Sequence, residues 1–178
     1  KSKKPLIVVG GGVKYSEAGE AVEAFCKEFN IPFGETQAGK SACKSSDPYC
    51  LGGIGVTGTL AANRIAKEAD TVLAIGSRLS DFTTGSKWLF REEGVQVLTI
   101  NNNRYHAYKM DAIKAVGDAK ATLEELAKAL REKNYRSAYK GEIESCKAEW
   151  DKEYNRLAEY AYKEEGFEPL VPERDPRT

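Results

Sequence analysis

The sequence predicts an α/β fold in which a Rossmann-like parallel sheet carries helices on both faces. Three observations predict it. Short apolar runs recur along the chain, segments with helical spacing of apolar residues separate them, and glycine or asparagine follows several of the runs. Strands that are apolar throughout are typical of parallel sheets buried on both faces. Ligands of such folds bind beyond the carboxyl ends of the strands.

The first part of the chain predicts two strands with a helix between them. Pro5–Val9 is apolar throughout and runs into Gly10–Gly12. Ser16 is placed to cap the following helix. Residues 31–36 form a second short strand, and residues 37–50 form a polar loop. The apolar face of the helix consists of Ala18, Ala21, Val22, Phe25, Cys26 and Phe29.

The middle of the chain continues the alternation. Thr57 or Thr59 can cap a helix that runs to Ala69, and residues 71–76 form the third strand. A loop then leads to a short helix around Trp88.

The last part of the chain adds two strands and two helices. The fourth and fifth strands cover residues 94–103 and 112–117. Asp118 is placed to cap an amphipathic helix. A long amphipathic helix with a charged outer face follows over residues 142–163.

These elements divide the chain into three segments. Residues 1–134 form the Rossmann-like domain, residues 135–165 hold the long amphipathic helix, and residues 166–178 form a linker. The chain opens with KSKK, without methionine or a signal pattern, and ends in the proline-broken tail EPLVPERDPRT. We therefore expect a part of a longer protein. The alternative is a natural chain that lacks only its initiator.

Composition limits the partners. Charged residues make up 30% and hydrophobic residues 41% of the 178 residues, as in globular proteins. The formal net charge is zero, so no general attraction to nucleic acid or to anionic membranes is expected. No apolar run approaches the ~20 residues of a membrane-spanning helix. We expect a cytoplasmic protein with neither nucleic acid nor membrane as partner.

Cysteine and histidine predict no metal site. The chain has no C-x-x-C pair, and His106 is its single histidine, whereas structural zinc sites use closely spaced pairs. Cys26 and Cys146 lie on apolar helix faces and are expected in the core. Cys43 and Cys50 flank a loop, where either a disulfide or reduced thiols fit, and reduced thiols are expected in the cytosol.

The glycines allow two interpretations that the sequence does not separate. Gly53 and Gly55 precede a helix, where backbone N–H groups can receive a phosphate. The same glycines also permit tight turns and close packing that need no ligand. A Walker loop fits the letters from Gly34 to Ser41. No helical pattern follows it and Pro48 interrupts the region, so a triphosphate site is not expected.

Polar residues near the strand ends complete a candidate ligand site. Arg78 can bind a diphosphate or pair with Asp81, and Asp118 can contact a ligand besides capping a helix. His106 is expected in a surface loop, and no catalytic Ser/His/Asp arrangement or pair of acids stands out. The candidate binding residues are Gly10, Gly11, Gly12, Gly53, Gly55, Gly76, Arg78, Asn101 and Asp118.

As a set, the motifs resemble the central domain of thiamine-diphosphate enzymes of the acetolactate synthase type. The matching stretches are LGGIGVTGT, GSRLSDFTTG, TINNN and GD, in the order of that family. The resemblance covers most of residues 5–130. The stretches GGGVKYSEA, ETQAGKSA and RLSDFTTGSKWLF resemble in particular one branch of this enzyme family, which acts in inositol catabolism. That branch hydrolyses a ring carbon–carbon bond of a trihydroxylated cyclic dione.

The resemblance implies an enzyme of three domains. The missing N- and C-terminal domains would supply the activating glutamate and bind thiamine diphosphate through Mg²⁺. Gly117–Asp118 and Asn101–Asn103 are not the family's G-D-G…N-N motif, because their order is reversed and Ala119 replaces the second glycine. Some relatives bind the nucleotide part of FAD in this domain. Here TINNN replaces HIDID, so FAD is not expected.

The implied function is that of a domain without its own catalytic residues. The full-length protein is expected to be a homo-oligomer that acts on a small molecule, and this chain alone is expected to be inactive. Two alternatives remain. One is the central domain of another member, such as an acetolactate synthase or a 2-oxoacid decarboxylase, and the other is a stand-alone nucleotide-binding module.

Overall fold

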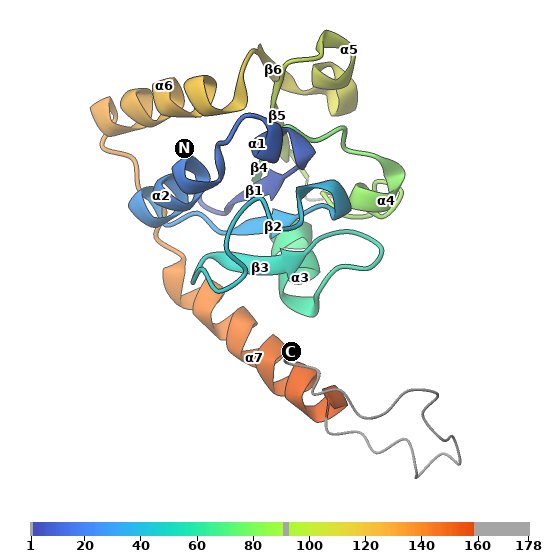
Figure 1. Cartoon of the computed structure of the whole chain (residues 1–178). Helices are drawn as coiled ribbons and strands as arrows, with labels where there is room; N and C mark the ends of the chain where they lie inside the picture. Colours follow the sequence, from blue (N-terminus) through green and yellow to red (C-terminus); the bar gives the residue numbers. More distant parts are fainter. Residues whose placement is uncertain (1, 91–92, 159–178) are drawn as a thin grey trace.

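The computed structural model describes residues 2–90 and 93–158 of the chain (Figure 1). Within these ranges six strands form one parallel sheet in the order β3-β2-β1-β4-β5-β6. The strands are β1 (Pro5–Val9), β2 (Phe33–Glu35), β3 (Cys50–Gly53), β4 (Thr71–Ile75), β5 (Gln96–Asn101) and β6 (Ile113–Val116). The predicted Rossmann-like class is confirmed.

The direction in which successive strands are added to the sheet reverses at β1. The chain moves outward from β1 to β2 and β3, returns to pair β4 with the other side of β1, and then moves outward to β5 and β6. Pro5 to Val9 pair in register with Thr71 to Ile75. In sheets of this kind the ends of the two strands at the reversal point form the crevice where ligands bind.

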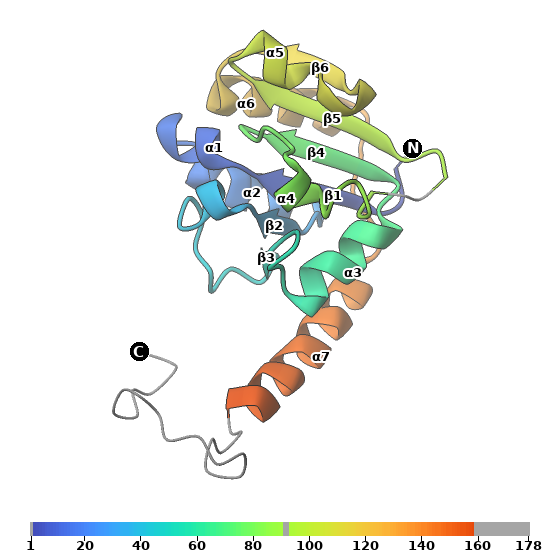
Figure 2. The ribbon, with the colours of Figure 1, turned by 90° about the vertical axis from the view of Figure 1, so that its right-hand side faces the viewer.

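Helices cover both faces of the sheet (Figure 2). The longer helices are α2 (Gly19–Phe29), α3 (Leu60–Glu68), α6 (Ala119–Glu132) and α7 (Lys140–Ala158). The short helical turns are α1 (Gly11–Tyr15), α4 (Asp81–Thr84), α5 (Arg104–Ala107), η1 (Gln37–Gly39) and η2 (Lys109–Asp111).

Alternation along β1 divides the core into two parts. Ile7 and Val9 belong to the core beneath α2 and α6, while Leu6 and Val8 belong to the core beneath α3 and the start of α7. All five residues of β1 are buried. Burial on both faces explains why β1 is apolar at every position instead of at every second one.

α7 leaves the body of the molecule as it proceeds (Figure 1). Ile143 and Cys146 near its start are buried, and its first half packs on α3. Further along, Tyr154 and Leu157 are exposed. The helix was predicted over residues 142–163. Its part beyond Ala158 and the predicted linker over residues 166–178 lie outside the described residues.

Three sequence expectations were wrong in detail. The strand β3 was not predicted: Cys50 was placed at the end of the loop over residues 37–50, and residues 51–53, two of them glycines, were assigned to no strand, although they pair with β2. Ser16 does not cap α2, since the separate turn α1 precedes it and Ala18 stands at the N-cap. The short helix expected around Trp88 is α4, which ends at Thr84.

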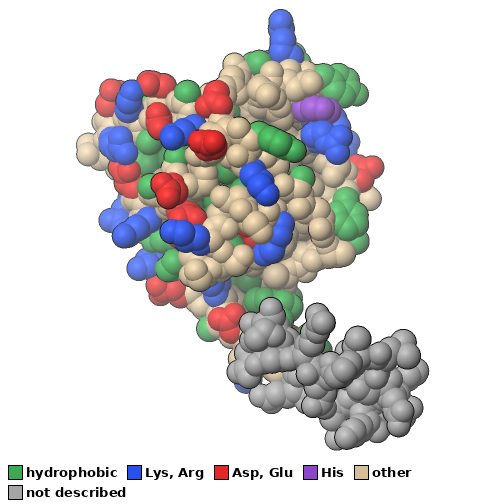
Figure 3. All heavy atoms as spheres, viewed as in Figure 1, with side chains coloured by type: hydrophobic (Ala, Val, Ile, Leu, Met, Phe, Trp, Pro, Cys, Tyr) green, Lys and Arg blue, Asp and Glu red, His purple; other side chains and the backbone are tan. Residues whose placement is uncertain are grey.

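Charges of both signs occur on the same face of the molecule. On the face shown in Figure 3, Lys and Arg side chains are intermixed with Asp and Glu side chains. This pattern agrees with the net charge of zero. Among the described helices, none combines the length and apolarity that crossing a membrane requires.

Candidate functional site

The nine predicted residues all lie at or just after the carboxyl ends of strands, and the glycines among them lie in two places. Gly10, Gly12 and Gly76 meet at the ends of β1 and β4, beside Asn101 at the end of β5. Gly55 lies apart from them, against the backbone of α4. The predicted residues therefore share the carboxyl edge of the sheet, but Gly55 packs on α4 and not with the glycines that follow β1 and β4.

Backbone fills the space that the glycines of β1 and β4 leave. The Gly10 N–H donates to the Ile75 carbonyl at 2.8 Å, and the Gly12 N–H donates to the Gly76 carbonyl at 3.0 Å. A Cβ atom added to Gly10 would lie 2.3 Å from the Gly76 oxygen. Gly76 itself has a φ of +60°. Two chain segments cross here in direct contact, so close packing by itself requires glycine at these positions.

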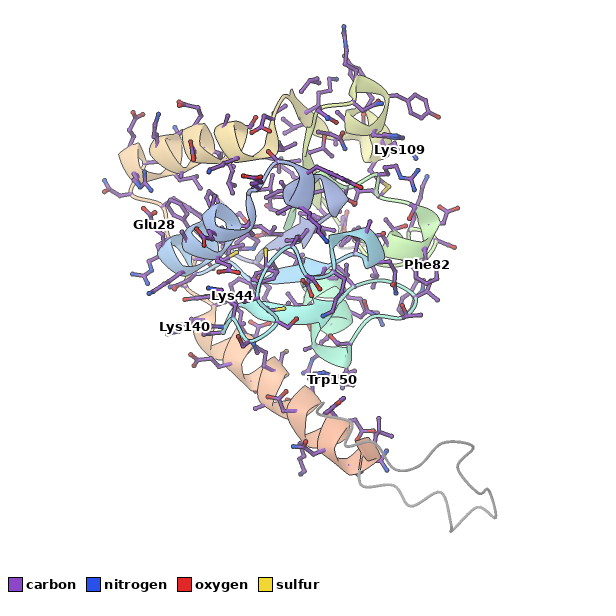
Figure 4. All side chains as sticks on the ribbon, in the orientation of Figure 1. Glu28, Lys44, Phe82, Lys109, Lys140 and Trp150 are labelled. Carbon is purple, nitrogen blue, oxygen red and sulfur yellow. The ribbon has the colours of Figure 1, made fainter. Side chains whose placement is uncertain are left out.

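The second group has a similar explanation. Gly55 has a φ of +105°, and a Cβ atom there would lie 2.2 Å from the Phe82 carbonyl oxygen. The Val56 N–H donates to the same oxygen at 3.0 Å. The glycine-rich loop before α3 thus packs on α4, whose Phe82 points outward in Figure 4. Gly53 has only ordinary contacts, and a Cβ atom at Gly11 would press on Ala38 at 3.2 Å.

Thr59 is the residue that starts α3. Its hydroxyl accepts from the Ala62 N–H at 3.0 Å and donates to the Leu51 carbonyl at 2.6 Å. One of the two predicted caps is therefore confirmed, and it also ties α3 to β3. Thr57 instead accepts from the Gln37 side chain at 2.9 Å.

Asn101 is a buried connector between strand ends. Its Nδ2 donates to the Ser77 carbonyl at 3.0 Å, and its Oδ1 accepts from the Asn103 N–H at 2.9 Å. Asn103 in turn caps α5, because its side chain accepts from the N–H groups of Tyr105 and His106. The asparagine run is used by the fold, and the Asn101 amide contributes one donated and one accepted hydrogen bond to it.

Arg78 and Asp118 lie on the surface of this edge. Arg78 is exposed, and no ion pair joins it to Asp81 in the described part of the chain. Asp118 caps α6, as predicted, by accepting from the Ala121 N–H at 3.0 Å. It also accepts from the Ser16 hydroxyl, and that hydrogen bond is the main reason that the pKa of Asp118 lies below its usual value. Ser16 thereby joins the end of α1 to the start of α6.

A buried acid that sequence reasoning did not single out lies nearby. The Glu35 side chain at the end of β2 is fully buried, and Lys40 donates to its Oε2 at 3.1 Å. No hydrogen-bond partner is found for its Oε1. The sequence feature that could have identified it is an acidic residue at the end of a predicted strand. Lys40 of the Walker-like stretch is thus engaged with protein, and turns rather than a helix follow Ser41.

The cysteines of the described ranges are buried, and these ranges contain no cluster of metal-binding side chains. All four cysteines are free and buried. Burial raises the pKa of Cys43 to about 12, so its thiol stays protonated near neutral pH. No cluster of three or more His, Cys, Asp or Glu residues that could hold a metal occurs among the described residues. His106 lies in α5 and is half-buried, not in a loop.

Comparison with known proteins gives consistent results. Residues 1–126 match the family model described as thiamine pyrophosphate enzyme, central domain. The chain is 57% identical over 173 residues to a 3D-(3,5/4)-trihydroxycyclohexane-1,2-dione hydrolase of Clostridium botulinum (strain Alaska E43 / Type E3), covering 97% of this chain. It is 52% identical over 171 residues to the protein of that name from Bacillus thuringiensis (strain Al Hakam).

These relatives are much longer than the chain. The alignments cover 27% of each relative. Among solved structures, a candidate thiamin diphosphate-dependent enzyme from Mycobacterium smegmatis aligns with a TM-score of 0.59 at 20% sequence identity. That alignment covers 71% of this chain and 25% of the other, and at this identity it supports the fold alone.

Proposed function

Because the chain belongs to the thiamine pyrophosphate enzyme central-domain family, we propose that it is the non-catalytic central domain of a hydrolase that opens the ring of 3D-(3,5/4)-trihydroxycyclohexane-1,2-dione. The observation that carries the proposal is the high identity over nearly the whole chain to relatives of that name. The branch-specific stretches GGGVKYSEA and RLSDFTTGSKWLF lie within the aligned part.

The described residues do not fit thiamine diphosphate or Mg²⁺. Beside Gly10 and Gly55, the positions that a side chain would take are occupied by the backbone of Gly76 and Phe82. No set of acids or other ligands able to hold a metal lies in the described ranges. In this proposal both groups are bound by other domains of a longer chain, in keeping with the greater length of the relatives.

The role proposed for this chain is to hold those domains in place. Its strand-end loops are stiffened by backbone contacts, as at Gly10 and Gly55, and by side-chain connectors, as at Asn101 and Asp118. Such loops present a rigid surface instead of a reactive one. We further propose a cytoplasmic homo-oligomer for the full-length protein, with a small-molecule substrate and without FAD.

The test compares a longer form of the protein, with all domains of its relatives, with the 178-residue chain. Each is supplied with thiamine diphosphate and Mg²⁺ and assayed for opening of the cyclic dione. We expect hydrolysis by the longer form and none by the 178-residue chain. Condensation or decarboxylation of 2-oxoacids by the longer form, without dione hydrolysis, would favour another member of the family. Hydrolysis by the short chain would refute its non-catalytic role.

A further inference from the structure

The outer side of β6 is open to another strand. Within the described residues β6 lies at one edge of the sheet and pairs only with β5. The Gly117 N–H, just after β6, donates to the Asn101 carbonyl of β5 at 3.1 Å. The main-chain groups of successive residues in a strand point to opposite sides, so those of Lys114 and Val116 point away from β5. This edge therefore presents N–H and C=O groups that an additional strand can pair with.

The two faces of β6 differ in chemistry. Ala115 packs on the core beneath α6, so Ile113 lies on the same face of the sheet, where it is 62% exposed. Lys114 lies on the other face, beside α5, because its neighbour Thr99 donates to the Ala107 carbonyl of α5 at 2.8 Å. Natural proteins protect edge strands with charges, prolines or bulges. Here a single lysine stands among apolar side chains that face solvent.

Cations without acidic partners border this edge. From residue 104 to residue 116 the chain has three cations, Arg104, Lys109 and Lys114, and one acid, Asp111. None of the three cations forms a salt bridge with an acid in the described ranges. This part of the surface is locally basic, although the whole chain has no net charge.

Two tyrosines join the cations into one surface. The Lys114 Nζ lies 3.9 Å from the centre of the Tyr108 ring. A hydrogen bond from Arg104 and the charge of Lys114 lower the pKa of Tyr108. Arg104 and Lys109 line a shallow hollow with Tyr105 and Tyr108, and Figure 4 shows Lys109 at the α5 end of the molecule. The basic surface thus runs from α5 to the open edge of β6.

These features together select an extended acidic peptide. An added strand can pair with the outward groups of Lys114 and Val116, whereas a helix uses its own main-chain groups internally. Acidic side chains complement the cations on the α5 face, and apolar side chains cover Ile113 on the other face. Side chains of a strand alternate between the two faces. The peptide that fits therefore carries acidic and apolar residues in alternation.

Other occupants fit these observations less well. A second copy paired through its own β6 would bring the same cations together, and like charges side by side weaken strand pairing. A single-stranded nucleic acid could neutralise the cations, but its backbone cannot pair with the edge of a sheet, and Ile113 would stay uncovered. The observations favour a polypeptide of opposite charge.

The last described helix lies at the other edge of the sheet. Lys147 of α7 donates to the Cys50 carbonyl of β3 at 2.7 Å, and β3 is the strand farthest from β6. Figures 1 and 2 both show α7 extending away from the end of the molecule that holds α5 and β6. We therefore take the partner to be a separate polypeptide.

We propose that the open edge of β6, with the cations and tyrosines of α5 beside it, binds an extended acidic segment of another protein as a further strand of the sheet. Acidic side chains of the segment lie on the α5 face beside Lys114, and apolar side chains lie beside Ile113. The surface includes none of the glycines of the candidate site, and the proposal does not rest on the hydrolase function.

The probe for the test is a capped peptide of alternating glutamate and valine, about six residues long, the usual length of a strand. It is titrated into the 178-residue chain, and the backbone amide resonances are followed. We expect saturable shifts at Lys114 and Val116, with a dissociation constant of about 10⁻⁴ to 10⁻³ M, the range for a few exposed hydrogen bonds and ion pairs. A peptide of alternating lysine and valine should shift neither resonance.

One pair of variants tests the main-chain pairing. Val116→Pro removes the outward N–H of Val116 and keeps the bonds to β5, because proline is tolerated in edge strands where its nitrogen faces solvent. It should weaken binding of the glutamate peptide by about tenfold or more. Val116→Ala is the matched control, since it shortens the side chain and keeps the N–H, and it should still bind.

A second pair tests the charge. Lys114→Glu places an acid where the peptide carries one and should weaken binding by about tenfold. This variant also replaces Val116→Pro if that protein does not fold. Lys152→Glu is its control, because it makes the same change in net charge on an exposed part of α7.

Several results would overturn the proposal. Two of them are the absence of saturable shifts at a peptide concentration of about 10⁻² M and equal binding of the lysine peptide. Unchanged affinity in folded Val116→Pro or in Lys114→Glu would do the same. Tighter binding of oligothymidylate at these residues would favour nucleic acid, and a dimer that Val116→Pro dissociates would favour a second copy. Peptide binding by the 178-residue chain but not by a longer form would show that the protein's own polypeptide covers the edge.

Discussion

Asn101 uses both ends of its amide for the fold. It donates to the Ser77 carbonyl after β4 and accepts from the Asn103 N–H after β5. A carboxylate at this position can accept but cannot donate when ionised. Asn101 stands where the motif of the similar family has an acid. Here the Ser77 carbonyl needs a hydrogen-bond donor, and this need exists without any ligand.

Asn101→Asp should lower the free energy of unfolding by about 1–3 kcal/mol, because the buried Ser77 carbonyl loses its donor and faces a like charge. Urea unfolding at neutral pH measures the change. Asn103→Asp is the control, since the Asn103 side chain only accepts hydrogen bonds at a helix N-cap, where aspartate serves equally well. Equal stability of the two variants would show that the donor role of Asn101 is unimportant.

Asp118 gives a pH dependence with a definite sign. The Ser16 hydroxyl and the N–H groups at the start of α6 lower the pKa of Asp118 from its ordinary value of 3.8. A carboxyl group whose pKa is lower in the folded state stabilises the fold above its unfolded pKa, and this contribution is lost as the pH falls through the folded pKa. The effect on stability therefore appears below about pH 4.

Wild type should be more stable than Asp118→Asn at pH 7, and the difference should shrink as the pH is lowered from 5 to 2. Melting temperatures of both proteins along this series measure it, and comparison at each pH cancels the titration of the other carboxylates. Ser16→Ala removes the main cause of the lowered pKa and should reduce the pH-dependent part. A difference that stays constant with pH would contradict the assignment.

The crossing of two turns joins the elements at the centre of the sheet. The turn from β1 into α1 and the turn after β4 touch through Gly10, Gly12 and Gly76, with no side chain between them. Neither turn can carry a Cβ atom unless the other moves. This contact explains why glycines recur at both places, whether or not a ligand is bound.

Gly10→Ala should lower the free energy of unfolding by about 3 kcal/mol, since the added Cβ meets the Gly76 carbonyl and a well-packed site resists extra atoms. Gly141→Ala is the matched control. Nothing lies within 4 Å of a Cβ atom at Gly141, which sits in α7, so alanine should stabilise the helix by roughly 0.5–1 kcal/mol. Urea unfolding compares them. A Gly10→Ala protein as stable as wild type would show that the two turns separate easily.

At the carboxyl edge of the sheet, few of the predicted residues are placed to bind a nucleotide. Backbone occupies the space beside the glycines, and the Asn101 amide is committed to Ser77 and Asn103. Arg78 is exposed and would hold a phosphate without a cradle around it. These contacts favour packing over a phosphate site as the reason for the glycines.

Calorimetry with FAD should show no binding tighter than about micromolar, which corresponds to roughly 8 kcal/mol. Arg78→Ala should give the same trace as wild type, because no built site surrounds that side chain. A protein that is yellow as purified, or a tight isotherm that Arg78→Ala abolishes, would overturn this prediction and favour a flavin-binding relative.

Local pattern predicted those parts of the fold that depend on neighbours in sequence. The bounds of β1 agree with the prediction because every residue in it is apolar and buried. Thr59 and Asp118 cap their helices because an N-cap bonds only to the next turn. β3 was missed since Cys50–Gly53 has no strand pattern of its own. Glu35 was overlooked because its burial at the end of β2, between β1 and β3, depends on the assembled sheet.

By itself the sequence determined the α/β class, the alternation of strands and helices, and the family to which the motifs belong, since periodicity and motif order are carried by the letters. Only the tertiary structure decided which atoms lie beside the glycines. A glycine in the sequence means only that a Cβ atom is absent. Whether a ligand or another stretch of backbone lies in that space depends on segments that are far apart in the chain. At Gly10 the occupant is the backbone of Gly76.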